Sequence, residues 1–201
     1  MTVPPTGPSA RRTPARDRLA AAANELFYAE GIHAVGVDRI IEHAGVSRAS
    51  FYNNFDSKEQ LIHAYLMARH QGTISRLSDA VGRHDDPRQK ILAVFDTQAA
   101  QFRQPDFNGC PFAAASTGAP PGGTIESDAA GFRAWIRALF TALAGEAGAP
   151  DPGPLGRQLH VLYDGAGLTA RMDRDPGIAS ATRSAVQALL DAAIPGRPRR
   201  A

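Results

Sequence analysis

The sequence predicts an all-α protein. Apolar residues recur at helical spacing in nearly every segment between proline or glycine clusters. No segment shows the sustained apolar/polar alternation typical of strands, and no apolar run approaches the roughly 20 residues that a membrane helix needs. A chain of 201 residues has room for a small module joined to a larger helical one.

Composition narrows the class of protein. The hydrophobic fraction of 43% and charged fraction of 21% are ordinary for a cytosolic domain, and residues 1–14 lack the apolar centre of a secretory signal. The single cysteine, Cys110, excludes an internal disulfide and a multi-cysteine metal site. A net charge of +2 does not by itself indicate nucleic-acid binding. We therefore expect a cytoplasmic protein without a membrane anchor, metal or cofactor.

Four helices are predicted in the first third of the chain. The first covers residues 16–30, with Gly31 as its stop, and the second covers residues 37–44, between Gly36 and Gly45. The third begins at Ser47 and turns Phe51 and Phe55 inward. The fourth is predicted to run to about Gly72, and Ser57 and Gln60 have the spacing of a capping box at its start.

The remaining segments also read as helices, at residues 87–103, 124–147, 154–172 and 176–194. Proline and glycine interrupt residues 104–123 and 148–154. Pro176 suits the first position of the last helix, where a missing N–H costs nothing.

The second and third predicted helices have the size and spacing of a helix-turn-helix, with Gly45 in the turn and Ser47 as the cap of the outer helix. Arginine, serine, asparagine and tyrosine share the outer surface of that helix, and these side chains bind bases and phosphates. From spacing alone, an ordinary helical hairpin with a solvent-exposed polar face explains the pattern about as well.

A resemblance separates these two interpretations. Residues 36–66, GVDRIIEHAGVSRASFYNNFDSKEQLIHAYL, resemble the DNA-binding segment of TetR-family regulators, including the Phe-Tyr-x-x-Phe and Ser-Lys-Glu elements. The resemblance covers roughly residues 16–66. It departs from the family at Gly36, where members often carry a threonine or serine cap.

The resemblance implies roles for individual residues. Bases would be contacted by Arg48, Ser50 and Asn53, and phosphates by Ser47, Tyr52 and Lys58; Arg39 could also reach the DNA. It further implies a transcriptional regulator, most commonly a repressor, that binds double-stranded DNA as a homodimer and answers to a small-molecule effector.

The domain organisation predicted in this way has four parts. Residues 1–15 form a disordered basic arm, 16–66 the DNA-binding domain, 67–196 the effector-binding and dimerisation domain, and 197–201 a basic tail. Residues 11–18 carry four arginines against one aspartate, so this run can follow a phosphate backbone; a solvated tail is the alternative.

The larger domain is expected to enclose the effector. Residues 107–115 are similar to a Gly-Cys-Pro-Phe element found in one subgroup of the family. Aromatic residues together with polar side chains that could orient a ligand suggest the lining of a pocket, although core packing is favoured for any single aromatic residue. The predicted lining is Phe95, Gln98, Phe102, Cys110, Phe112, Trp135 and Tyr163. For Cys110, packing is favoured over redox sensing because no cationic neighbour in sequence would activate the thiol.

The last two helices are predicted to form the dimer interface. They carry more apolar surface than one small core needs, and Ala166, Gly167 and Ala170 allow close helix approach. A two-fold dimer predicts an inverted-repeat DNA site with half-sites about 34 Å apart, or a multiple of that.

Two other classes of function remain open on the sequence. An enzyme is disfavoured because no nucleophile elbow, phosphate-binding glycine loop or metal-spaced histidine pair is present. A helical module that binds a protein partner differs from a DNA-binding protein in its salt dependence, since phosphate contacts weaken steeply with ionic strength.

Overall fold

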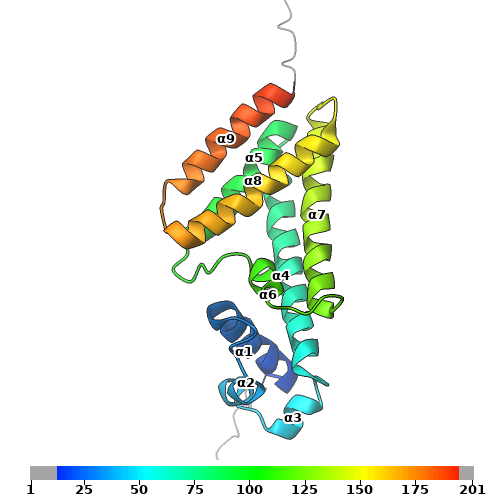
Figure 1. Ribbon diagram of the computed structural model, residues 1–201, viewed down its shortest axis with the longest axis vertical. Helices are drawn as coiled ribbons and strands as arrows, with labels where there is room; N and C mark the ends of the chain where they lie inside the picture. Colours follow the sequence, from blue (N-terminus) through cyan, green and yellow to red (C-terminus); the bar gives the residue numbers. More distant parts are fainter. Residues whose placement is uncertain (1–12, 195–201) are drawn as a thin grey trace, which may run out of the picture. The chain divides into compact units, whose positions relative to one another are not determined.

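The computed structural model describes residues 13–194, and this part of the chain is helical without strands, which confirms the predicted fold class (Figure 1). In order, the helices are α1 (Ala15–Glu30), α2 (Val37–Ala44), α3 (Arg48–Tyr52), α4 (Lys58–Val81), α5 (Pro87–Phe102), α6 (Pro111–Ser116), α7 (Thr124–Glu146), α8 (Pro152–Asp173) and α9 (Ile178–Ala193). The predicted basic tail and most of the predicted basic arm lie outside the described residues. Within these residues, no helix combines the length and apolarity needed to cross a membrane.

The chain divides into two compact units, residues 1–65 and 66–201. In the first unit, α1 packs on α2 and α3. Its core is apolar and aromatic: Leu19, Ile40, Phe51 and Phe55 are almost completely buried, and Phe27 meets Tyr65 edge-to-face at 5.6 Å between ring centroids. Helices this short are marginal in isolation, so this shared core is what stabilises α2 and α3.

The second unit is built around α5, α7, α8 and α9. Helix α8 packs along α7, and α9 covers α5 and α8 (Figure 1). Ion pairs tie α5 to α9, from Arg88 to Asp191 and from Arg183 to Asp96. The core of this unit includes Ile91, Ile136, Phe140, Leu159 and Leu190, all with 1% of their surface exposed or less.

Helix α4 is longer than predicted. It continues through Gly72 to Val81, because an isolated glycine weakens a helix without ending it and buried Leu77 anchors the additional turns. The helix ends at Val81, and the Asp86-Pro87 pair starts α5, where the Asp86 carboxylate accepts a hydrogen bond from the backbone N–H of Arg88.

Two further boundaries differ from the prediction. The interrupted stretch 104–123 contains the short helix α6, which starts at Pro111. Helix α9 starts at Ile178, so the placement of Pro176 as its first residue is wrong. The Asp175 carboxylate accepts a 2.7 Å hydrogen bond from the Gly177 N–H, and the resulting turn holds Pro176 outside the helix.

Candidate nucleic-acid interface and internal cavity

The turn between α2 and α3 depends on Gly45. Its φ of 61° lies in the left-handed region. Its own N–H donates to the carbonyl of Glu42, and the N–H of Val46 donates to the carbonyl of Ile41, in a Schellman pattern. The Arg18 guanidinium donates to the carbonyls of Ala44 and Gly45 at 3.1 and 2.8 Å. The end of α2 is therefore closed by backbone and side-chain donors together.

Arg16 and Arg18 belong to the fold of the first unit. Arg16 donates to the carbonyl of Asn54 at 2.8 Å and lies over the Phe55 ring at 4.6 Å, while Arg18 holds the turn. Of the four arginines in the run 11–18 that was predicted to follow a phosphate backbone, these two are held by tertiary contacts, and the other two lie outside the described residues.

Helix α3 presents a polar outer face. Ser47 caps it by accepting a 3.1 Å hydrogen bond from the Ser50 N–H, as the sequence predicts, while the ring of Phe51 is buried beneath. Arg48, Tyr52 and Asn53 are exposed. Tyr52 is 48% exposed, although its ring packs edge-to-face on Phe51 at 5.1 Å. The Tyr52 side chain is therefore held by Phe51 on one side and is free to contact a binding partner on the other.

Both arginines predicted to reach DNA have a carboxylate partner. Arg48 pairs with Asp38, which is 78% exposed, and Arg39 pairs with Glu30 at 2.7 Å. Both pairs lie at the solvent-exposed surface, where ion pairs contribute little to stability. They hold the guanidinium groups in place without burying them.

Lys58 begins α4 beside the cap formed by Ser57. The Ser57 hydroxyl accepts a 3.1 Å hydrogen bond from the Gln60 N–H, and Gln60 Oε1 accepts one from the Asp56 N–H at 2.8 Å. The predicted hydrogen bond to the Ser57 hydroxyl is thus confirmed. The second bond of the capping box, made by the Gln60 side chain, is formed with the N–H of Asp56 and not with that of Ser57. Partial burial lowers the pKa of Lys58.

All seven residues predicted to bind DNA lie in the first unit, between α2 and the start of α4: Arg39, Ser47, Arg48, Ser50, Tyr52, Asn53 and Lys58. Gly36 caps α2 without a side-chain hydrogen bond, in agreement with the predicted loss of one capping contact. Two short helices at a glycine turn, with an exposed polar second helix, define a helix-turn-helix protein.

The second unit contains a cavity of about 390 Å³ between α6, α7 and α8. Cys110, Phe112 and Phe132 contribute apolar lining, and Arg133, Asp164 and Arg171 contribute charge. The rings of Phe112 and Phe132 stack in parallel at 4.0 Å between centroids. The size and the mixture of apolar walls with few polar groups are typical of small-molecule sites.

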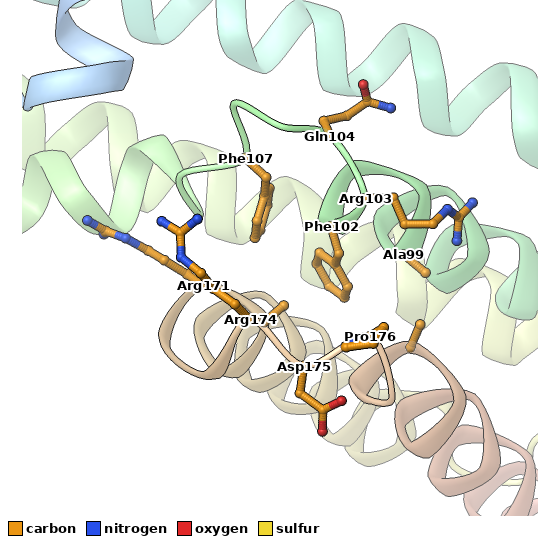
Figure 2. A pocket seen from close by; sticks show the side chains of 11 residues that line it. Ala99, Phe102, Arg103, Gln104, Phe107, Arg171, Arg174, Asp175 and Pro176 are labelled. Carbon is orange, nitrogen blue, oxygen red and sulfur yellow. The ribbon is translucent and has the colours of Figure 1, made fainter.

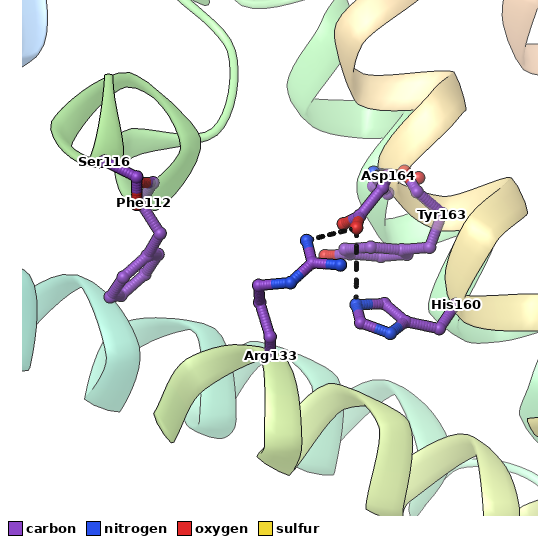
Figure 3. Close-up of polar contacts among 7 residues, drawn as sticks. Phe112, Ser116, Arg133, His160, Tyr163 and Asp164 are labelled. Atoms are coloured by element: carbon purple, nitrogen blue, oxygen red, sulfur yellow. Dashed lines mark hydrogen bonds and ion pairs between the residues drawn. The ribbon is translucent and has the colours of Figure 1, made fainter. Parts of the chain in front are cut away.

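A polar network borders this cavity (Figure 3). Arg133 Nη1 donates to Asp164 Oδ2 at 2.5 Å, and His160 Nε2 lies 3.4 Å from the same oxygen. His160 is 3% exposed, and its Nε2 makes no hydrogen bond. Burial lowers the pKa of His160, while the Asp164 carboxylate acts in the opposite direction.

Of the residues predicted to line the effector pocket, Cys110 and Phe112 border the cavity. Phe95 instead stacks on Phe140 at 5.3 Å in the core, and Gln98 donates to the carbonyl of Tyr163 at 2.7 Å. Burial raises the pKa of Tyr163 far above its ordinary value.

Two other members of the predicted lining lie elsewhere in the second unit. Trp135 packs on His70 at 5.4 Å between ring centroids. Phe102 borders a different pocket, at the end of α5.

Sequence reasoning missed the Arg133–Asp164 pair. These residues lie 31 positions apart on different helices, so no local spacing relates them. The i,i+4 spacing of His160 and Asp164 on α8 was a usable signal. Burial also raises the pKa of the Cys110 thiol, which opposes thiolate reactivity.

Comparison with known proteins agrees with the geometry of the first unit. Residues 19–65 match the model of the family described as bacterial regulatory proteins, tetR family. The chain is 32% identical over 145 residues to the uncharacterized HTH-type transcriptional regulator Rv1255c of Mycobacterium tuberculosis, spanning 72% of this chain and 69% of that protein. It is also 36% identical to the HTH-type transcriptional activator FasR of Mycolicibacterium smegmatis, over 40% of this chain and 37% of FasR.

Solved structures extend the likeness to both units. SCO4454, a TetR-family transcriptional regulator from Streptomyces coelicolor, is 33% identical with a TM-score of 0.86, over 90% of each chain. The protein sav143 from Streptomyces avermitilis is 32% identical with a TM-score of 0.81, over 90% of this chain and 98% of that one.

This chain belongs to the TetR family of bacterial regulatory proteins. It is a DNA-binding transcriptional regulator, and members of this class are not enzymes.

Proposed function

We propose that this protein is a homodimeric repressor that binds an inverted-repeat operator and leaves it when a small molecule occupies the cavity of the second unit. The observation that carries the proposal is the outer face of α3, where Arg48, Tyr52 and Asn53 are exposed over the buried Phe51. Recognition helices of this kind read base edges in the major groove.

The proposed division of labour on the DNA follows side-chain chemistry. Arg48, Ser50 and Asn53 contact bases, because arginine pairs bidentately with guanine and asparagine with adenine. Ser47, Tyr52 and Lys58 hold phosphates, and Arg39 is a further contact. Arg48 must leave Asp38 to reach a base, so the two partners compete for the same guanidinium.

An unpartnered apolar face on α8 supports the dimer. Four large hydrophobic side chains are exposed among residues 13–194, and three of them lie on one stripe of this helix with exposures of 60–72%: Val161, Leu168 and Met172. A row of exposed alanines follows one face of the neighbouring α9, at positions 181, 185, 188 and 192. Two such helices from each of two subunits form a four-helix interface.

The small residues predicted to form that interface lie on another face of α8. Ala166, Gly167 and Ala170 are buried inside the subunit, and a Cβ on Gly167 would lie 3.2 Å from Gln98 Nε2. They allow α8 to approach α5, so the interface is assigned to the opposite face of α8.

Effector release is proposed to work by population shift. Phe112 and Cys110 border the cavity next to the Arg133–Asp164 pair, and a ligand there favours one arrangement of α6, α7 and α8. The ligand weakens DNA binding only to the extent that it prefers the conformation with poor DNA affinity.

Selection of binding sites from a random DNA pool tests the proposal. Enrichment of an inverted repeat, with weaker binding by Tyr52→Phe and Arg48→Ala, is the expected result. Failure to enrich any sequence at low salt contradicts a DNA-binding role for α3. A reporter carrying the selected site then distinguishes repression from the activation named for FasR.

A further inference from the structure

A second pocket lies in the larger unit, where α5 ends and the turn between α8 and α9 passes beside it (Figure 2). Its volume is about 210 Å³, below the roughly 300–1,000 Å³ of drug-sized sites, so it suits a small ligand. It shares only Arg171 with the cavity between α6, α7 and α8.

The inner surface of this pocket is apolar. Phe102 and Phe107 meet at 5.2 Å between ring centroids, and Figure 2 shows both rings at its centre. Ala99 and Ala170 complete the surface beside them, and Pro176 lies at the turn. This lining favours a ring or a short hydrocarbon chain.

The polar part of the pocket is cationic. Arg103, Arg171 and Arg174 all line it, and none of them has a carboxylate partner among residues 13–194. By contrast, Arg88, Arg133 and Arg183 in the same unit each pair with an aspartate.

The single carboxylate in the lining does not offset this charge. Asp175 accepts the 2.7 Å hydrogen bond from the Gly177 N–H, and Figure 2 shows its carboxylate directed away from the phenylalanine rings. The side chains of Arg171 and Arg174 lie on the Phe107 side of the pocket, and Arg103 lies on the other side.

Two of the arginines are constrained, one by its backbone and the other by packing of its side chain. Arg174 has φ 51°, the one positive φ of a non-glycine residue in the described chain, and its N–H donates to the carbonyl of Ala170 at 3.2 Å. Such a conformation costs free energy in an arginine. Arg171 packs its aliphatic stem over Gly109, where a Cβ would lie 2.7 Å from Arg171 Cδ. Both guanidinium groups therefore extend from constrained positions.

From these features we infer that the pocket binds a small monocarboxylate with an aromatic or short aliphatic body. Guanidinium groups bind carboxylates through paired charge-assisted hydrogen bonds, and the two phenylalanine rings take the apolar body. The site goes beyond the proposed effector cavity and does not depend on it, because Arg174 and both phenylalanines border this pocket alone.

Ligand-observed NMR on the full chain, with benzoate as the probe, tests this inference. Benzamide has nearly the same shape without the charge, and inorganic phosphate has charge without a ring. Benzoate is expected to bind at least about 10-fold more tightly than either, since one lost charge-assisted contact corresponds to about 1.5–3 kcal/mol. Equal affinity for benzamide, or for phosphate, overturns the inference.

Variants locate the site. Arg174→Gln is expected to weaken benzoate binding at least about 5-fold, while Arg157→Gln, at an exposed position of α8, leaves it unchanged. Ala113→Phe, which reduces the other cavity, is expected to leave it unchanged as well. Unaltered binding by Arg174→Gln overturns the inference, and so does loss of binding in Ala113→Phe. Neither result bears on operator binding, which is measured separately.

Discussion

At the scale of single residues, Asp38 is proposed to limit the availability of Arg48, the arginine proposed to contact bases. Its carboxylate pairs with Arg48 in the free protein, and a carboxylate near phosphates is itself repelled. Asp38→Asn is therefore expected to tighten operator binding about 1.5- to 5-fold, as measured by fluorescence anisotropy at fixed salt.

Glu42→Gln is the matched control for Asp38→Asn. It removes one negative charge from the same helix, α2, and Glu42 forms no ion pair within residues 13–194. A gain from Glu42→Gln as large as that from Asp38→Asn would show that bulk charge, and not release of Arg48, is responsible.

His160 makes stability depend on pH. Its side chain is buried beside Asp164, Arg133 and Arg137, and burial is the largest cause of its lowered pKa. In the unfolded chain the imidazole takes up a proton near pH 6.5, whereas in the folded protein it resists protonation. Its contribution to stability is therefore complete above that pH and is lost as the pH falls through and below it.

Urea denaturation between pH 7.5 and pH 5.5 checks this expectation. The free energy of unfolding should fall with pH in the natural protein and fall less in His160→Asn. His84→Asn, at an exposed position, is the control and should keep the full slope. An unchanged slope in His160→Asn contradicts the assignment.

At the scale of elements, the crossing of α7 and α8 requires a glycine. A Cβ at Gly156 would lie 2.8 Å from the backbone N and Cα of Thr141, a distance that backbone atoms cannot relieve without moving the helices. Gly156→Ala is expected to lower the free energy of unfolding by about 1–3 kcal/mol, measured by urea denaturation.

Gly131→Ala is the companion variant. Gly131 is an exposed position in α7, and a Cβ added there would have nothing within 4 Å, so alanine should stabilise the helix by up to about 1 kcal/mol. Destabilisation by both variants to the same degree would mean that the close crossing is not the cause.

At the scale of the whole molecule, the exposed stripe on α8 is proposed to mediate dimerisation. Val161→Asp places a charge in that stripe, where Val161 is 66% exposed in the single chain. The variant is expected to remain folded and to sediment as a monomer. Because one subunit holds one half-site, operator affinity should fall at least about 100-fold.

The control places the same charge on another exposed helix face. Ala138→Asp, on α7, is expected to leave both the sedimentation coefficient and the affinity for the operator unchanged. A dimeric Val161→Asp protein would assign the interface to another surface.

The helical class, most helix positions and the helix-turn-helix could be predicted from the amino-acid sequence alone. These features depend on interactions between residues close in the chain: the Ser47 hydroxyl reaches the N–H of Ser50, and Gly45 supplies the left-handed φ of the turn. Periodicity and capping report such local interactions directly.

Which residues share a cavity, and which face of α8 is free, depended instead on packing between distant parts of the chain. Arg133 meets Asp164 and Arg171 crosses Gly109 over long separations in sequence, and no spacing rule relates residues on different helices. The same holds for Ala166, Gly167 and Ala170: their small size indicates a close approach, but the partner helix is set by packing of the whole unit.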